Sequence, residues 1–131
     1  MYYFAYGTDL GHETMKKICP DCKPLFPAEL PNYKLAFTGW ERKWRGGIAT
    51  IRPFRGGRVM GGVYEISDRD MKLLDRQQGY PTRYDWLNII VIPKGGDPVE
   101  AVTYIRREQS EETEPSKQYL EAMRKGYDDW V

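Results

Sequence analysis

The first ten residues, Met1 to Leu10, restrict the possible folds more than any other stretch of the chain. The run from Tyr2 to Tyr6 is apolar and aromatic, which predicts a buried β-strand. Gly7 ends this run, and Thr8 and Asp9 offer side-chain oxygens for capping a following helix. A strand, a glycine turn and a helix start direct free backbone N–H groups beyond the strand, where they can hold a carboxylate or an oxyanion. An ordinary strand-to-helix connection has the same pattern, so this stretch alone does not distinguish an anion-binding turn from a structural one.

Length and charge limit the classes of protein to which the chain can belong. Its 131 residues suit one domain, 1–131, with one hydrophobic core. The formal net charge of +1 argues against nucleic acid and anionic membranes as partners. No apolar run is long enough to span a bilayer, and the N-terminus lacks the basic and apolar regions of a signal peptide. We therefore expect a cytoplasmic location and no membrane partner.

The two cysteines, Cys19 and Cys22, lie in the sequence Cys-Pro-Asp-Cys, and His12 is the only histidine. A structural zinc site within one chain needs four ligands, so we expect no metal. The cysteine pair follows a predicted helix, whereas a thioredoxin-like pair opens one. We interpret the pair as two thiols, or a local disulfide, in a loop.

The rest of the chain predicts short strands and short helices in mixed order. Pro20, Pro24, Pro27 and Pro31 argue against a long regular element in this region. Arg55-Gly-Gly-Arg58 is typical of a hairpin turn. We predict helices over 10–18, from 67 to about 79 and from 115 onward, and strands over 2–6, 33–37, 47–52, 59–66, 84–92 and 99–105.

Three local patterns add detail to these elements. Ser67-Asp-Arg-Asp70 resembles a capping box at a helix start. Gly61-Gly62 inside a predicted strand indicates a bulge or a close backbone approach. Tyr119, Met123 and Gly126 share one face at helical spacing. About six short strands and three short helices imply an α+β fold, a small barrel or curled sheet with peripheral short helices.

Four stretches of the chain carry recognisable motifs in one order. Tyr3 to Leu10 reads YFAYGTDL, Trp44 to Ile51 reads WRGGIATI, and Leu74 to Gly79 reads LDRQQG. Tyr104 and the segment from Pro115 to Tyr119, PSKQY, complete the set. Together they resemble the YFAYGSNL, W-x-GG-x-AT-I, LD-x-x-EG and Y…PS-x-x-Y motifs of the gamma-glutamylcyclotransferase (AIG2-like) family. The order and spacing agree over nearly the whole chain.

The resemblance implies a mixed β-barrel with a pocket at one end, and an enzyme that acts on a small gamma-glutamyl amine or peptide. The substrate's own α-amine attacks its side-chain carbonyl, which forms 5-oxoproline and releases the amine. A carboxylate must first take a proton from the substrate ammonium. No cofactor, metal or protein nucleophile is required, and a homodimer is left open. The resemblance places position 78 in the catalytic role and the substrate contacts at Tyr3, Phe4, Ala5, Tyr6, Gly7, Thr8 and Tyr119.

The most consequential departure from the family pattern is Gln78, which stands where the family has its catalytic glutamate. A glutamine amide has nearly the shape of a glutamate, but it cannot accept a proton at neutral pH. Either the exchange was introduced to trap a ligand, or this is a natural member that has lost the activity or uses another base. In each case we expect Gly7 and Gln78 to face one cavity.

A second departure is Asp9, because the family commonly has asparagine there. Its charge would weaken an anion site at the Gly7 turn unless the side chain points away. Asp75, three residues before Gln78, is an alternative base, although its position also suits a structural hydrogen bond. Tyr6 and Tyr104 are candidate wall residues, and Tyr84 fits the core equally well.

Two further functions compete with the enzyme. The first is a catalytically silent module that binds gamma-glutamyl compounds, which the amide at Gln78 favours. The second is binding of single-stranded nucleic acid with stacking on Trp40 and Trp44, which the balanced net charge disfavours. The basic residues for this would be Arg42, Lys43, Arg45, Arg52, Arg55 and Arg58. Trp40 and Trp44 could instead line the mouth of a pocket, or simply cover the barrel.

Overall fold

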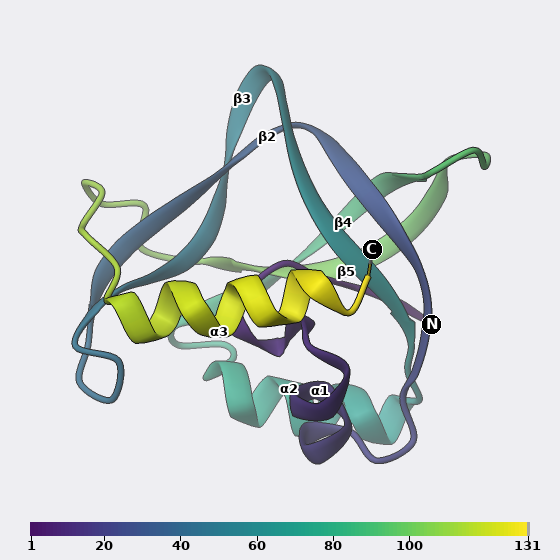
Figure 1. Ribbon diagram of the computed structural model, residues 1–131, viewed down its shortest axis with the longest axis horizontal. Coiled ribbons are helices and arrows are strands. Elements are labelled where there is room, and N and C mark those ends of the chain that lie inside the picture. Colours follow the sequence, from purple (N-terminus) through teal and green to yellow (C-terminus); the bar gives the residue numbers. More distant parts are fainter. Residues whose placement is uncertain (131) are drawn as a thin grey trace.

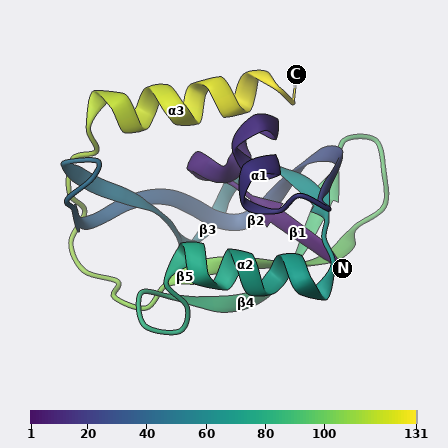
Figure 2. The same cartoon turned by 90° about the horizontal axis from the view of Figure 1, so that it is seen from below.

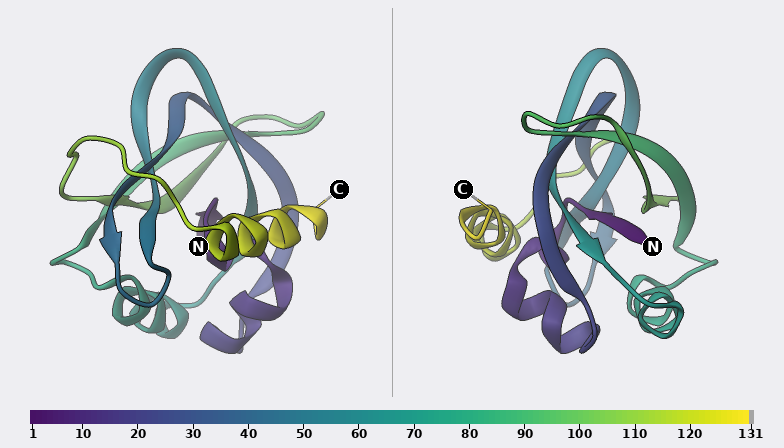
Figure 3. Two further views of the ribbon diagram at one scale, coloured as in Figure 1. Left: turned by 60° about the vertical axis from the view of Figure 1, so that its left-hand side comes forward. Right: turned by 90° about the vertical axis from the view of Figure 1, so that its right-hand side faces the viewer.

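The computed structural model describes residues 1–130 as five strands and three α-helices, with a short 3₁₀ helix, Thr8–Leu10, after the first strand. The strands form a closed barrel in the order β1-β3-β2-β4-β5. The helices gather at one end of the barrel, and the bends of the long strands form the other end (Figures 1 and 3). The elements are β1 Tyr2–Ala5, α1 His12–Ile18, β2 Lys23–Glu41, β3 Gly46–Glu65, α2 Asp68–Gln78, β4 Tyr84–Pro93, β5 Val99–Arg106 and α3 Lys117–Asp128.

β1 closes the barrel between two strands of opposite direction. It pairs antiparallel with β3, from Tyr2 opposite Glu65 to Ala5 opposite Gly62, and parallel with β5 at Tyr3 opposite Val102. The other pairs of neighbouring strands are antiparallel. The predicted α+β fold, a small mixed barrel with peripheral short helices, is therefore confirmed.

β2 corrects our prediction that prolines prevent regular structure over residues 20–31. The strand begins at Lys23 and passes through Pro24, Pro27 and Pro31. Proline is tolerated where its side of the strand has no partner or where the register shifts. β2 pairs with β4 at only two positions, and two of its register shifts lie beside Pro24 and Pro31.

β3 is one strand of 20 residues, where the sequence predicted two strands joined by a hairpin turn. Pro53 pairs with Tyr33 and Arg58 pairs with Pro31, so the chain continues along β2 across the predicted turn. The extra residues of β3 form a bulge opposite Asn32, whose side chain accepts a hydrogen bond from the Gly56 N–H. The hairpin turn between β2 and β3 lies at residues 42–45 instead.

The predicted glycine pair within β3 makes the close approaches that the sequence indicated. A methyl group on Gly61 would collide with the carbonyl oxygen of Ala5 in β1, and one on Gly62 would collide with the indole of Trp130. These glycines therefore let β1 and the C-terminal segment lie directly against β3.

The helices begin and end close to the predicted positions. The Ser67 hydroxyl accepts from the Asp70 N–H, and the Asp70 carboxylate accepts from the Ser67 N–H, which confirms the capping box of α2. Gly79 ends α2 with a left-handed φ of 73°. α3 starts after Ser116, and its buried residues are Tyr119, Met123 and Gly126, as predicted. The first helix is shorter than predicted, because α1 starts at His12.

The three helices surround the opening at their end of the barrel. Seen from below, α1 lies between α2 and α3, and the strands run behind them (Figure 2). The C-terminal end of α2, the 3₁₀ helix after β1 and the start of α3 therefore come together, although they are far apart in sequence. No helix of residues 1–130 is long and apolar enough to cross a membrane.

The close approach at Gly61 makes a first prediction. Gly61→Ala should lower the free energy of unfolding by about 1–3 kcal/mol, because the added methyl overlaps backbone that is paired on both sides. Gly96→Ala is the control, since its methyl meets only Pro93, at 3.3 Å. Urea unfolding measures both variants; equal midpoints would contradict the tight contact between β1 and β3.

Candidate active site

A small pocket lies at the helical end of the barrel, and the sequence elements that line it come from six parts of the chain. Its volume is about 40 Å³, enough for a water-sized group. Gly7 and Gln78 both line it, as we expected. The full lining is Tyr3, Tyr6, Gly7, Thr8, Asp9, Ala49, Gln78, Tyr84, Tyr104 and Tyr119. We call this space the inner pocket.

The inner pocket opens into a larger groove of about 300 Å³, which we call the outer groove. The two spaces share Thr8, Asp9, Gln78, Tyr84 and Tyr119 as lining residues. The outer groove also has charged walls, provided by Glu41, Lys43 and Arg83. A ligand can therefore place a small polar part in the inner pocket and a larger part in the outer groove.

Of the two tryptophans considered for the mouth, only one reaches the site. Trp44 lines the outer groove, and its ring packs edge-on against Tyr119 at a centroid distance of 5.2 Å. Trp40 is 65% exposed and lines neither space. Trp40 lies within β2, whereas Trp44 lies in the turn at residues 42–45 and packs against Tyr119 of α3.

Tyrosine hydroxyl groups dominate the inner pocket, and most are fixed by the backbone. Tyr6 donates to the carbonyl of Tyr104 at 2.6 Å, and Tyr84 donates to the carbonyl of Ala49 at 2.6 Å. The Ala49 N–H donates to the hydroxyl of Tyr119 at 2.7 Å. Tyr119 therefore accepts with its oxygen and keeps its own proton for donation. Burial raises its pKa to about 12, so it remains a neutral donor at physiological pH.

Asp9 is the carboxylate of the inner pocket. Its residue is only 6% exposed, and its Oδ2 accepts from the Tyr3 hydroxyl and from Gln78 Nε2, the latter at 3.5 Å. Burial raises its pKa, and hydrogen bonds from Tyr3 and from the backbone of Asp9 and Gly7 offset this only in part. The side chain thus points into the site that we expected to bind an anion.

This orientation corrects the predicted capping role of Thr8 and Asp9. No side chain caps the 3₁₀ helix, and Gly11 holds the N-cap position of α1 without a side-chain hydrogen bond. The Asp9 carboxylate is occupied by Tyr3 from β1, a partner that is adjacent to it only in the folded barrel. The negative charge makes the inner pocket suitable for a cationic group such as an ammonium.

Asp75, the alternative base considered from the sequence, has a structural position. Its Oδ1 accepts from the Tyr104 hydroxyl at 2.6 Å and from Trp86 Nε1 at 2.7 Å. The Trp86 ring stacks on Tyr80 at 4.6 Å. Asp75 lines neither the inner pocket nor the outer groove. It therefore fastens α2 to β4 and β5 outside the site.

The residues predicted to contact substrate divide into two groups. Tyr3, Tyr6, Gly7, Thr8 and Tyr119 line the inner pocket together with Gln78. Phe4 and Ala5 do not line it, because both are fully buried in the paired part of β1. Their contact with a substrate stays a prediction. Sequence reasoning missed Ala49, although it lies within the WRGGIATI motif. It also did not decide whether Tyr84 belongs to the core or to the site.

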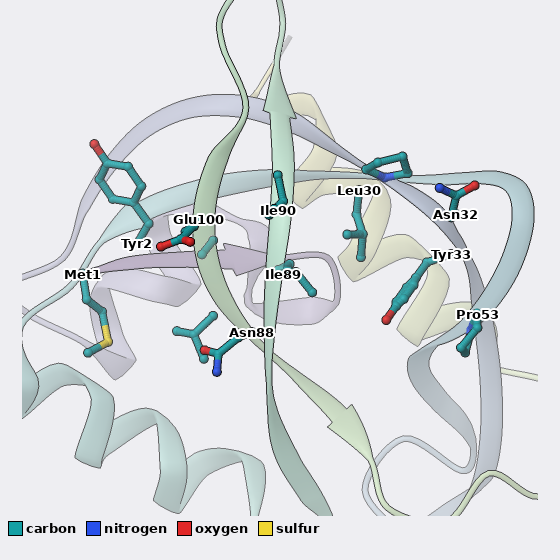
Figure 4. A pocket seen from close by; sticks show the side chains of 13 residues that line it. Met1, Tyr2, Leu30, Asn32, Tyr33, Pro53, Asn88, Ile89, Ile90 and Glu100 are labelled. Atoms are coloured by element: carbon teal, nitrogen blue, oxygen red, sulfur yellow. The ribbon is translucent and has the colours of Figure 1, made fainter.

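A larger groove of about 950 Å³ lies elsewhere, over the strands and away from the helical end. Figure 4 shows its side chains, from Met1 and Tyr2 across β4 and β5 to Tyr33 and Pro53. Among the described residues, its lining holds one carboxylate, Glu100, and no basic side chain. It lacks the convergent polar groups that mark a reactive site, so the smaller inner pocket is the better candidate.

The described residues provide no cluster of three or more histidine, cysteine, aspartate or glutamate side chains suited to a metal ion. Cys19 and Cys22 are buried free thiols. Burial raises the pKa of Cys19 to about 12, which makes it a poor nucleophile at physiological pH. The reactive groups of the site are therefore its carboxylate, amide and hydroxyl groups.

Comparisons with known proteins match this fold. The family model for gamma-glutamyl cyclotransferase, AIG2-like, matches residues 3–126. Gamma-glutamylcyclotransferases of Homo sapiens and Mus musculus are 31% and 32% identical over 122 residues, which cover 89% of this chain and 64% of each relative. A solved gamma-glutamyl cyclotransferase is 29% identical with a TM-score of 0.93, and the match covers 99% of this chain and 79% of the other. The chain thus spans less than two thirds of the curated relatives' length.

The hydrogen bond between Ala49 and Tyr119 makes a second prediction. Tyr119→Phe should lower the free energy of unfolding by about 1–3 kcal/mol, because the buried Ala49 N–H loses its acceptor. Tyr2→Phe is the matched control, and should change stability by less than about 0.5 kcal/mol, since Tyr2 lies half-buried at the 950 Å³ groove. Chemical denaturation measures both; equal losses would mean that Tyr119 contributes only generic packing.

Proposed function

The chain belongs to the AIG2-like gamma-glutamyl cyclotransferase family, and we propose that its helical-end site binds a small gamma-glutamyl amine or peptide and cyclises the glutamyl group to 5-oxoproline. The observation that carries this proposal is the composition of the inner pocket. It joins the Gly7 turn, the free proton of the Tyr119 hydroxyl and position 78 around one buried carboxylate. These are the groups that an amine-releasing cyclisation needs.

The reaction begins with the α-amine of the substrate, which is an ammonium at neutral pH and cannot attack. A carboxylate takes one proton, and the amine nitrogen then forms a bond to the side-chain carbonyl carbon, which gives a five-membered ring. The bond from that carbon to the departing nitrogen breaks as that nitrogen receives the first proton. The ring nitrogen then gives up a second proton, so the amine is released in its ammonium form. No water is consumed. Because the attack is intramolecular, holding the glutamyl group in a folded conformation supplies much of the rate.

The site contains donors for the oxygen that becomes negative during this attack. Tyr119 keeps a proton for donation because its oxygen accepts from Ala49, and the Gly7–Thr8 backbone lies beside it. Donors that are already in place stabilise such an oxyanion without having to reorganise. These groups support placing the substrate's reacting carbonyl at the inner pocket.

The outer groove is where we place the departing amine. Glu41, Lys43, Arg83 and Trp44 line it, so it offers both charges and an aromatic surface to the leaving group. The leaving group could be a free amino acid, a peptide such as cysteinylglycine, a polyamine or a lysine isopeptide. Each of these would make different contacts with the lining residues of the outer groove. Its mixed charge favours a leaving group that carries polar or charged atoms.

A catalytically silent module that binds the same compounds is the second candidate, and Gln78 is the observation that favours it. Its amide donates to Asp9 and cannot take a proton. The two candidates predict the same binding and differ in turnover alone.

A panel of gamma-glutamyl amines and peptides separates these functions. We expect calorimetry to detect binding of at least one compound, and chromatography to detect 5-oxoproline and free amine in equal amounts. Binding without 5-oxoproline would support the silent module. The absence of both, across the panel, would contradict the proposed function.

Gly7 provides a test of where the compound binds. A methyl at Gly7 would lie 3.8 Å from Ala49 Cβ and 4.0 Å from the Tyr119 hydroxyl, so Gly7→Ala fits the fold but takes up space in the inner pocket. The backbone φ of −105° is accessible to other residues, so crowding, rather than backbone strain, is the expected effect. Binding measured by calorimetry should weaken from Gly7→Ala to Gly7→Val while both proteins stay folded. A folded Gly7→Val variant with the parent's affinity would place the ligand elsewhere.

A further inference from the structure

We propose that Asp9 is the general base of the cyclisation, and that Gln78 positions it by donating a hydrogen bond to its carboxylate. This inference rests on the proposed function, since it names the group that takes the substrate proton. It also explains how a site with an amide at position 78 can still turn over.

The other acidic side chains near the site are unsuited to this role. Asp75 is occupied by Tyr104 and Trp86 and lines neither space. Glu41 lines the outer groove but not the inner pocket, and its Oε2 accepts a hydrogen bond from the Trp44 N–H at 3.1 Å. Among the described residues that line the inner pocket, Asp9 is the only carboxylate.

The geometry of Asp9 places one of its carboxylate oxygens beside Gly7. Oδ2 accepts from both Tyr3 and Gln78. Oδ1 lies 3.8 Å from the point that a methyl on Gly7 would occupy, and the same point is 3.8 Å from Ala49 and 4.0 Å from the Tyr119 hydroxyl. An ammonium over Gly7 would therefore lie against Oδ1, and the carbonyl that it attacks would lie on the side of Tyr119.

The environment of Asp9 strengthens it as a base. Burial raises its pKa, and a carboxylate of higher pKa accepts a proton more readily at neutral pH. The titratable groups that face it are tyrosines and one thiol, namely Tyr3 on β1, Tyr6 after it, Cys19 after α1, Tyr64 on β3, Tyr84 on β4, Tyr104 on β5, and Tyr119 and Tyr127 on α3. Burial raises the pKa of each, so they remain neutral while Asp9 titrates.

Gln78 suits this arrangement better than a second carboxylate would. Its Nε2 donates to Oδ2 of Asp9 at 3.5 Å and so stabilises the charged form. Two carboxylates at that separation would share one proton, and their titration would belong to the pair. The amide is therefore the uncharged partner that lets a single carboxylate at position 9 ionise.

The experiment compares five proteins on a substrate that the parent binds. They are the parent, Asp9→Asn, Gln78→Glu, the double variant with both changes, and the control Asp75→Asn. Asp9→Asn should reduce 5-oxoproline formation by about a hundred- to ten-thousand-fold, the usual worth of a general base. Its affinity for the substrate should change far less. Asp75→Asn should keep most of the parent activity, and the double variant should regain activity relative to Asp9→Asn.

Two readouts separate a base from a merely structural residue. In the parent, the rate should fall in acid as Asp9 gains a proton, and Gln78→Glu alone should move this acid limb to higher pH because the two carboxylates share a proton. Melting temperature is the second readout. Because the folded-state pKa of Asp9 is raised, its ionisation costs stability as pH rises. Asp9→Asn should therefore melt higher than the parent at neutral pH, and the gap should close in acid.

The outcomes distinguish this proposal from the proposed function. An Asp9→Asn protein that cyclises as fast as the parent would overturn the role of Asp9 while the function stands. A silent parent with an active double variant would overturn it as well, because the base would then belong at position 78. If none of the proteins binds or cyclises any gamma-glutamyl compound, both proposals fail.

Discussion

The packing of β1 against the glycine pair of β3 is the constraint on which the site depends. β1 is only four residues long, yet it joins β3 to β5 and so closes the barrel. Its backbone lies so near Gly61 that a side chain there would collide with it. Thr103 of β5 holds it from the other side, donating to the carbonyl of Phe4 at 2.7 Å. Because the Gly7 turn continues directly from β1, the position of the inner pocket follows from this closure.

The sequence predicted the elements whose signals are local. The capping box at Ser67, the end of α2 at Gly79 and the paired strands β4 and β5 depend on neighbouring residues, and each was found near its predicted position. The path of β2 through Pro27 could not be predicted, since it depends on which edge of the strand lacks a partner. The orientation of the Asp9 side chain could not be predicted either. A cap and a buried carboxylate look alike in sequence, and the Tyr3 hydroxyl that decides between them meets Asp9 only after β1 is in place.

A buried carboxylate is costly to a small barrel, and Asp9 has no basic side chain among its described hydrogen-bond partners. Tyr3 and the local backbone favour its charged form, yet burial still dominates and raises its pKa. An asparagine would accept from the same Tyr3 hydroxyl without that cost. Groups held at such a cost in a cleft are more often found at functional sites than in structural roles. The same reasoning separates Asp9 from Asp75, whose two strong donors from Tyr104 and Trp86 give it a structural purpose.

The two departures from the family motifs are one feature of the folded protein. In the sequence, Asp9 and Gln78 lie far apart and each weakens the resemblance separately. In the structure, the Gln78 amide donates to the Asp9 carboxylate across the inner pocket. The family motifs have an amide at position 9 and a carboxylate at position 78, whereas this chain has a carboxylate at position 9 and an amide at position 78. The pair therefore still consists of one amide and one carboxylate. A change at either position alone would leave two amides or two carboxylates facing each other. Under the proposed function, the pair keeps one carboxylate beside Gly7 to act as the base that an amide at position 78 cannot be.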